Sequence, residues 1–221
     1  MKKLALLITV FITIGFIFSQ TVFSKSKYHN KKGAGATKNN IENVNSPSEV
    51  CLSKEEESLY KKIMAYRKKH KLPKIPLSPS LTMVAQKHAL NQTQFKPKGK
   101  CSLHSWGKGG KWKPCCYDDQ GKPPECMWDK PNEITGFDST GFEITVFGYI
   151  LDDDNTAGHI NSKHALDDWK KSPSHNSLIL NKEPWNETKW GAIGVGMHLG
   201  FANVWFTEES DPNGSPKKCK K

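Results

Sequence analysis

His175 lies in a segment whose residue types suit the presentation of a side chain. Ser172 is a favoured helix N-cap residue and Pro173 suits a first helical turn, so the spacing predicts a new helix here. His175 falls in the first turn of that helix, ahead of the apolar residues 178–180. An imidazole can bind a divalent ion or exchange a proton near neutral pH. A histidine in a helix turn can equally serve structure alone, and the sequence leaves both interpretations open.

The chain lacks the motifs of several common enzyme classes. It has no Gly-x-Ser-x-Gly elbow of a serine hydrolase, no His-Glu-x-x-His metalloprotease helix and no phosphate-binding glycine loop. Its cysteines are expected to be oxidised, which argues against a cysteine nucleophile. The sequence therefore does not decide whether the protein is an enzyme.

Residues 1–24 have the composition of a secretory signal peptide. Two lysines follow Met1, residues 4–18 are apolar, and the triplet 22–24 (Val-Phe-Ser) is an acceptable cleavage context. We therefore expect a secreted protein, extracellular or periplasmic. Residues 4–24 carry no charge and are long enough to span a bilayer, so a membrane anchor that is not cleaved is the alternative.

The cysteine content also indicates export. Disulfides rather than free thiols are expected, because exported proteins meet an oxidising compartment. Within a cluster over residues 101–126 we expect two local bridges, and a staple from Cys51 to Cys219 across the domain ends. A zinc site in the cluster is the competing interpretation, which the absence of a Cys-x-x-Cys pair makes weaker. The six candidates are Cys51, Cys101, Cys115, Cys116, Cys126 and Cys219.

The net charge of +11 is concentrated outside the expected folded part. Residues 51–216 hold 22 basic and 20 acidic side chains, a net charge of only +2. Proteins that bind nucleic acid usually carry a basic face on the domain itself, so no nucleic-acid partner is expected. The basic tails could contact anionic surfaces such as membranes or wall polymers, or they could simply be solvated.

The composition divides the chain into segments. Residues 25–50 are rich in Lys, Asn, Gly, Ser and Thr and are expected to be a disordered linker. The folded domain is expected over residues 51–210, with an insert at about 96–140, and a basic tail follows over residues 211–221.

Helix-start signals recur in the folded part. Ser53 and Glu56 form a capping-box pattern, and Ser78 followed by Pro79 predicts a second helix. Another helix is expected to open at Thr156, behind three aspartates that suit the positive end of its dipole.

Small residues in a late strand indicate close packing. The segment 191–196 reads Gly-Ala-Ile-Gly-Val-Gly, and its glycines leave room for another element to approach. Two strands are expected at about residues 190–198 and 203–208. Four helices with this small hairpin predict an α+β fold.

The insert is expected to be mostly irregular and held by disulfides. Its tryptophans, Trp106, Trp112 and Trp128, could bind a sugar, a lipid or a partner, but more often such residues form the small core that a loop needs. His88, on an apolar face of the second helix, is expected to be a core histidine with its hydrogen bonds satisfied.

Taken together, two features resemble the CAP superfamily, also called SCP or PR-1-like. They are the Ser-Pro-x-His turn that ends at His175 and the glycine-spaced strand at 191–196. The resemblance covers about residues 53–208. It implies a CAP-like α-β-α sandwich, with helices packed around a small antiparallel sheet.

The resemblance also implies a cleft lined by His104, Glu143 and His175. Glu143 is assigned through the family's Gly-Glu-Asn context, from which this chain departs by an extra residue and a missing asparagine. A second glutamate of the plant and animal branches is replaced here by Ser172.

The three cleft residues are candidate ligands for zinc or another divalent cation, with positions left for water or substrate. The implied function is an exported binding or interaction module for a lipid, a sterol or a cell-surface component. The alternative is a metal-dependent, peptidase-like hydrolase that uses the same cleft. The three side chains could also bind nothing and only hydrogen-bond to one another.

Overall fold

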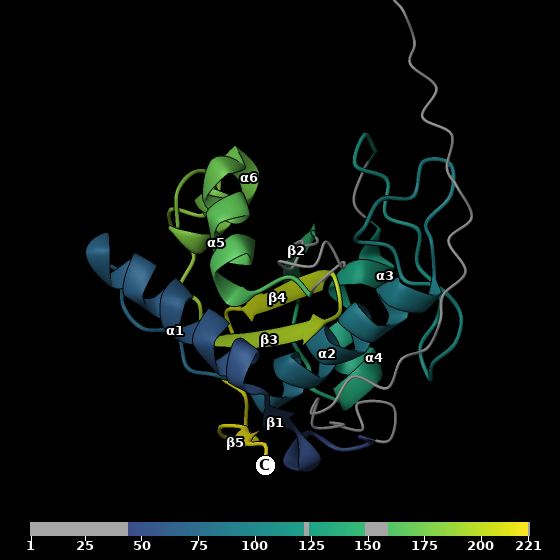
Figure 1. Ribbon diagram of the computed structural model, residues 1–221, viewed down its shortest axis with the longest axis horizontal. Helices are drawn as coiled ribbons and strands as arrows, with labels where there is room; N and C mark the ends of the chain where they lie inside the picture. The colour runs from purple at the N-terminus through teal and green to yellow at the C-terminus, as the bar shows by residue number, and fades with distance from the viewer. Residues whose placement is uncertain (1–43, 122–123, 149–158, 221) are drawn as a thin grey trace, which may run out of the picture. The chain divides into compact units, whose positions relative to one another are not determined.

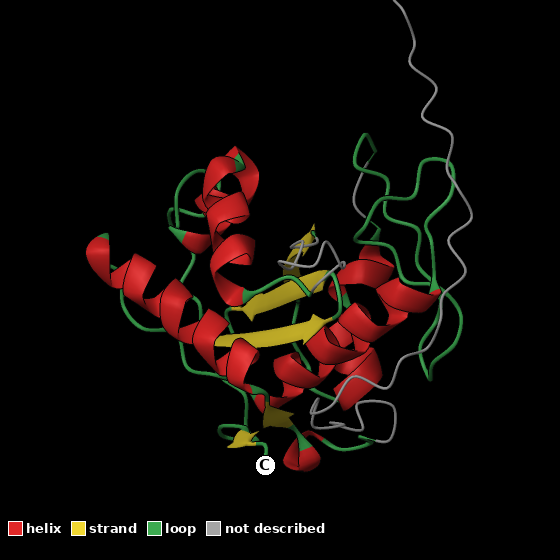
Figure 2. Cartoon of the chain, viewed as in Figure 1, coloured by secondary structure: helices red, strands yellow, loops and turns green. Residues whose placement is uncertain are grey.

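The computed structural model describes residues 44–121, 124–148 and 159–220. The expected signal peptide and most of the expected linker lie outside these residues. The described part combines helices with a small antiparallel sheet, which confirms the α+β class (Figures 1 and 2). None of its helices is long and apolar enough to cross a membrane.

Two helices begin where the caps predict. Helix α1 spans Lys54–Lys69, and Ser53 and Glu56 form the reciprocal capping box at its start. Helix α2 spans Pro79–Gln94, and the Ser78 side chain accepts a hydrogen bond from the backbone of Leu81. Because these caps satisfy backbone groups that a helix end leaves unpaired, they fix where each helix begins.

The central sheet has three antiparallel strands in the order β2-β4-β3. Strands β3 (Ala192–His198) and β4 (Phe201–Thr207) are the expected hairpin. Strand β2 (Phe142–Phe147) was not among the expected strands. It pairs with β4 along its whole length and lies at one edge of the sheet.

Side chains alternate between the two faces of the sheet. On β4, Val204 and Phe206 join the core cluster with α1, α5 and α6, whereas Trp205 joins the cluster with α2 and the insert. The helices thus form one layer on each face, with the sheet between them, as the expected α-β-α sandwich requires (Figure 1).

The glycines of β3 allow α2 to lie directly against the sheet. A Cβ atom on Gly194 would lie 2.1 Å from the backbone carbon of Leu81, and one on Gly196 would lie 2.2 Å from that of Ala85. No side chain fits at these distances, so both positions need glycine.

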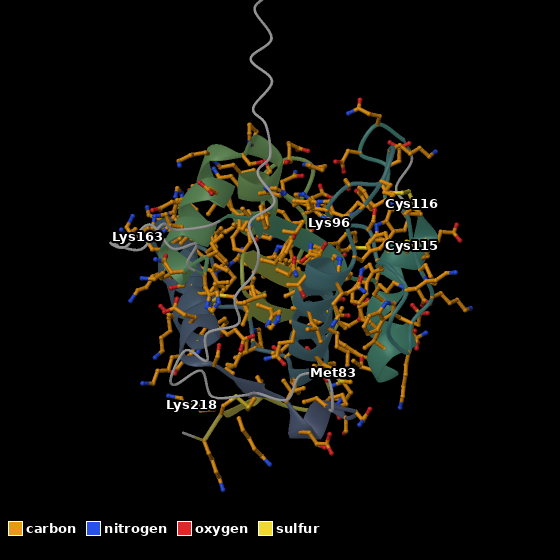
Figure 3. All side chains as sticks on the ribbon, turned by 45° about the vertical axis from the view of Figure 1, so that its right-hand side comes forward. Met83, Lys96, Cys115, Cys116, Lys163 and Lys218 are labelled. Atoms are coloured by element: carbon orange, nitrogen blue, oxygen red, sulfur yellow. A yellow bond between two sulfur atoms is a disulfide. The ribbon has the colours of Figure 1, made fainter. Side chains whose placement is uncertain are left out.

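Two short helices and two disulfides lie in the described part of the insert. Helix α3 spans Glu125–Trp128 and helix α4 spans Lys130–Thr135. The disulfides are Cys101–Cys116 and Cys115–Cys126 (Figure 3). Trp106 is 1% exposed and lies in the core cluster beside α2, so this tryptophan fills the core of the insert.

The expected basic tail returns to the start of the domain. Strand β5 (Lys217–Lys218) pairs in parallel with β1 (Cys51–Leu52), which follows a 3-10 turn at Pro47–Glu49. A disulfide joins Cys51 to Cys219. Farther back, Asp211 accepts hydrogen bonds from the Ser78 hydroxyl and the Ser80 backbone at the start of α2.

Two helices complete the layer that includes α1. Helix α5 spans Ser162–Lys171, and the Asn161 side chain caps it. The start expected at Thr156 lies outside the described residues, and the described helix begins at Ser162. Helix α6 spans Pro173–Ile179 and follows Ser172, as the Ser-Pro pattern predicts.

Candidate functional site

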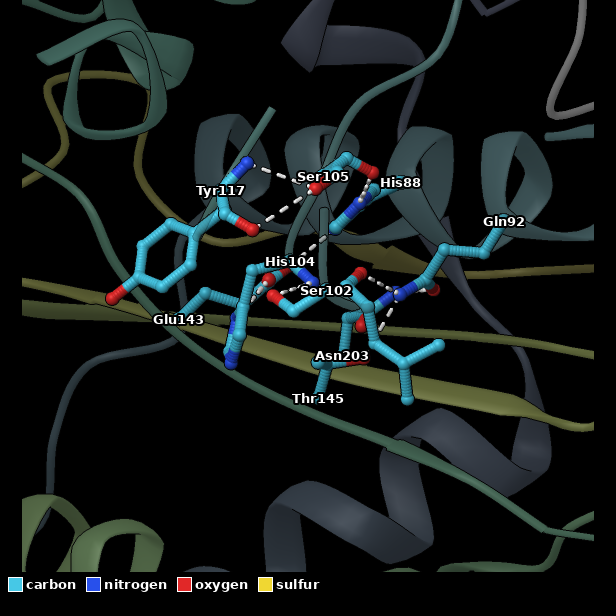
Figure 4. A network of polar contacts seen from close by, with 10 residues as sticks. His88, Gln92, Ser102, His104, Ser105, Tyr117, Glu143, Thr145 and Asn203 are labelled. Carbon is cyan, nitrogen blue, oxygen red and sulfur yellow. Dashed lines mark hydrogen bonds and ion pairs between the residues drawn. The ribbon is translucent and has the colours of Figure 1, made fainter. Parts of the chain in front are cut away.

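Glu143 is the centre of a polar cluster at the β2 edge of the sheet. Its side chain is only 1% exposed. One carboxylate oxygen lies 2.5 Å from Nδ1 of His88, and the other accepts a hydrogen bond from Nδ1 of His104 at 2.9 Å (Figure 4). Glu143 therefore joins a histidine of helix α2 to a histidine of the insert.

His88 is completely buried, and both of its ring nitrogens face acceptors. Nδ1 faces the Glu143 carboxylate, and Nε2 lies 3.2 Å from the carbonyl oxygen of Ser105. A carbonyl oxygen only accepts hydrogen bonds, so the ring satisfies both contacts when it donates from both nitrogens, as an imidazolium. It also stacks on Trp106 with ring centroids 4.2 Å apart, a face that favours a cation.

These contacts decide the charge of Glu143. Burial alone would raise the pKa of its carboxyl group, but the charge of His88 and the hydrogen bonds from both histidines overcome that effect. The net result is a pKa below the ordinary value, so Glu143 is an anion at neutral pH.

His104 is held by a small disulfide-linked frame. The backbone N–H of Ser102 donates to the Tyr117 carbonyl at 2.8 Å, and that of Tyr117 donates to the Ser105 hydroxyl at 2.9 Å. The Cys101–Cys116 disulfide joins the same two segments. Because Nδ1 of His104 donates to Glu143, the lone pair of the neutral ring lies on Nε2.

Gln92 connects the frame to the sheet. It lies one helical turn after His88 on α2, and its amide donates to the Leu103 carbonyl at 2.8 Å and to the Thr145 hydroxyl at 3.0 Å. Two consecutive turns of α2 thus position both the residue before His104 and the strand that carries Glu143.

His175 approaches the cluster from helix α6. Its ring centroid lies 6.4 Å from that of His104. Burial lowers the pKa of His175, and protonation of His104 would lower it further, so the His175 ring is neutral at neutral pH. Helix α6 is itself tied to α1 by a hydrogen bond of 3.0 Å from the Tyr66 hydroxyl to the Asn176 side chain.

The structure thus brings His104, Glu143 and His175 together from three separate parts of the chain. Sequence reasoning placed His88 in the core, where it is, but missed its contact with Glu143. It also missed Tyr117, whose ring lies 4.9 Å from that of His104. One signal for the polar role of this helix face was present in the sequence. His88 and Gln92 are four residues apart, which places both on the same face of the helix.

The residues fit a metal ion only in part. No group of three or more His, Cys, Asp and Glu side chains in the described ranges is arranged to hold a metal. Both oxygens of Glu143 already face histidines and its side chain is only 1% exposed, so Glu143 is better placed to orient His104 than to contact an ion itself. The donors that fit are the imidazoles of His104 and His175, with Glu143 as the orienting carboxylate behind His104.

The cluster also has the parts of a general base. A carboxylate behind a neutral histidine is the arrangement that activates a hydroxyl nucleophile in many hydrolases. Within the described part of the chain, no hydroxyl or thiol side chain hydrogen-bonds to the His104 ring.

The chain matches no family model, and a search of curated proteins finds no match. Among solved structures it is similar to an outer surface protein of Borrelia burgdorferi, at 16% identity and a TM-score of 0.46, covering 72% of this chain and 95% of that one. It is also similar to a cysteine-rich secretory protein of Staphylococcus aureus, at 18% identity and a TM-score of 0.44. A third is an extracellular protein with an SCP domain from Bacillus anthracis, at 14% identity and a TM-score of 0.46.

Two of these similarities cover less than half of the other protein. This chain spans 38% of the S. aureus protein and 40% of the B. anthracis protein, while these matches cover 70% of this chain.

Proposed function

We propose that the protein is an exported SCP-like binding module whose His104–His175 pair takes a divalent cation, with zinc as the first candidate. The observation that carries the proposal is the Glu143–His104 hydrogen bond, together with the His175 ring 6.4 Å from that of His104. The bond sets the tautomer in which His104 keeps Nε2 for a ligand, and the lowered pKa of His175 keeps its ring neutral and able to bind a metal.

Two imidazoles leave positions of a zinc ion open. When bound, the ion supplies a Lewis-acidic centre for oxygen donors. His104 and His175 would hold it, and Glu143 would orient His104 without leaving its buried place. A binding module of this kind would recognise a carboxylate, phosphate or hydroxyl group of a cell-surface component or a lipid head group.

Export is part of the proposal, and three disulfides support it. The lysines near the C-terminus would add a non-specific electrostatic attraction to anionic surfaces. Release of the protein from its surface by moderate salt would test this contribution, because salt screens exposed charges.

A metal-dependent hydrolase is the second candidate, and the Glu143–His104 pair favours it. A zinc ion held by His104 and His175 would supply the activated water that a hydrolase needs, and Glu143 would orient His104 for that role. The two candidates share a site but differ in turnover.

The deciding experiment is zinc titration calorimetry of the purified exported domain beside a His104→Ala/His175→Ala variant. His164→Ala is the matched control, because His164 is an exposed histidine of α5 outside the cluster. We expect one zinc per chain in the wild type and the control, and no binding in the double variant. Equal zinc binding by the folded double variant would overturn the proposal.

Assays with peptide and ester substrates, with and without zinc, separate the two candidates. The binding module predicts no turnover by the zinc-loaded protein. Turnover that is lost in a folded His175→Ala variant would establish the hydrolase instead.

A further inference from the structure

A cavity of about 460 Å³ lies on another side of α2, between that helix, α4 and the turn at 109–112. The apolar lining of the cavity comes from Met83 and Leu90 of α2, Ile134 of α4 and Trp112. Met83 is labelled in Figure 3. Its volume falls in the range of roughly 300–1,000 Å³ that small-molecule sites occupy. None of His104, Glu143 and His175 lines it, so it is distinct from the histidine cluster.

Two lysines face this cavity, and no carboxylate lines it with them. Lys87 of α2 and Lys111 of the turn are these lysines. Neither forms an ion pair with a carboxylate of the described residues. Because both lysines line the same cavity, their like charges repel one another. Burial, and then the charge of Lys111, lower the pKa of Lys87. An anion between them would relieve that repulsion.

Hydrogen bonds and ring contacts hold the wall of the cavity that lies opposite α2. The Trp112 indole N–H donates to the Gly107 carbonyl at 2.9 Å, and the ring meets that of Trp106 edge-on at 5.1 Å. Asn91, which is buried in α2, accepts a hydrogen bond from the Gly107 backbone at 2.8 Å. A Cβ atom on residue 110 would lie 2.1 Å from the Trp112 ring, so Gly110 is what allows the ring to take this position.

We propose that this cavity is a second binding site, for a small organic anion with an apolar body, such as an aryl or alkyl carboxylate or sulfonate. The lysines Lys87 and Lys111 would bind the charged group, and the apolar body would lie against Trp112, Met83 and Leu90. Apolar walls with a few convergent charged groups are the usual composition of such sites. This proposal does not depend on the function of the histidine cluster.

The test compares two fluorescent probes that share an aromatic body. The anion is 8-anilinonaphthalene-1-sulfonate, and the neutral analogue is N-phenyl-1-naphthylamine. Each is titrated against the wild-type domain and against Lys87→Met and Lys111→Met variants, which keep the apolar stem of the side chain. Lys96→Met is the control, because Lys96 is an exposed lysine just after α2 that does not line the cavity.

We expect one sulfonate to bind per chain. Each cavity variant should bind it about tenfold more weakly, as for the loss of one charged hydrogen bond. The affinity of the Lys96→Met control should equal that of the wild type. The neutral analogue should bind more weakly than the sulfonate and should not respond to the lysine variants. Sulfonate binding that is equal in all four proteins, or neutral binding as tight as sulfonate binding, would overturn the site.

A second measurement locates the probe without any change to the lysines. The indole N–H resonance of Trp112, assigned by its loss in Trp112→Phe, should shift as the wild-type domain is titrated with the sulfonate. A saturating sulfonate that leaves this resonance in place would put the probe elsewhere and reject the proposal.

Discussion

His88 and Glu143 form a buried charge pair that links helix α2 to the edge strand of the sheet. Nδ1 of His88 lies 2.5 Å from the carboxylate, and the two side chains are 0% and 1% exposed. The second nitrogen of His88 faces a carbonyl oxygen, and its ring stacks on Trp106. The same carboxylate accepts a hydrogen bond from His104. The pair that links α2 to the sheet therefore also orients a histidine of the candidate site.

Removing one partner of this pair should be much worse than removing both. His88→Leu leaves the Glu143 anion buried with only the His104 hydrogen bond, and we expect a loss of about 3 kcal/mol or more in the free energy of unfolding. His88→Leu/Glu143→Leu leaves no buried charge, so its loss should be well below the sum of the two single losses. Urea unfolding at neutral pH measures all four proteins. Additive losses would show that the two groups do not interact.

The lowered pKa of Glu143 predicts a loss of stability in acid. A carboxyl group whose pKa is lower in the folded state stabilises the fold above its unfolded pKa, about 4.5, and this contribution is lost as the pH falls through the folded-state pKa. Glu143→Gln has no such contribution and keeps the other acids. The difference in unfolding free energy between wild type and Glu143→Gln should therefore be full at neutral pH and shrink below pH 4.5. A difference that does not change with pH would refute the assigned charge state.

The sequence predicted the features of the fold that depend on residues close together in the chain. The caps at Ser53 and Ser78 set the starts of α1 and α2, because an unpaired helix end needs a nearby side-chain acceptor. The glycines of β3 indicated a close approach before the approaching element was known, and that element is α2. Strand β2 escaped prediction because it follows an irregular insert and its pairing with β4 is set by a contact distant in sequence.

The contacts of the candidate site also join residues that are distant in the sequence. His104, Glu143 and His175 were named from a family resemblance, and no spacing in the sequence indicates that they meet. The part played by His88 depends on the direction of both ring nitrogens, which follows from how α2 packs on the sheet. Such contacts depend on tertiary packing, and a sequence pattern records only which helix face a residue occupies.

The Cys101–Cys116 disulfide joins the two segments that carry His104 and Tyr117. Two backbone hydrogen bonds of 2.8 Å cross between these segments, from Ser102 to Tyr117 and from Trp106 to Cys115. A bridge that closes a loop of this size stabilises a protein by about 3 kcal/mol in the chain-entropy view. The local bridge should therefore protect the frame around His104, whereas Cys51–Cys219 should act on the whole domain.

Amide hydrogen exchange separates these two effects. In Cys101→Ser/Cys116→Ser, we expect the amides of Ser102 and Trp106 to lose protection while those of α1 keep theirs relative to global unfolding. In Cys51→Ser/Cys219→Ser, the matched control, global stability should fall and the two frame amides should remain as protected as the rest of the core. Equal protection of the frame amides in both variants would mean that the insert holds His104 without its disulfide, through the Glu143 and Gln92 contacts alone.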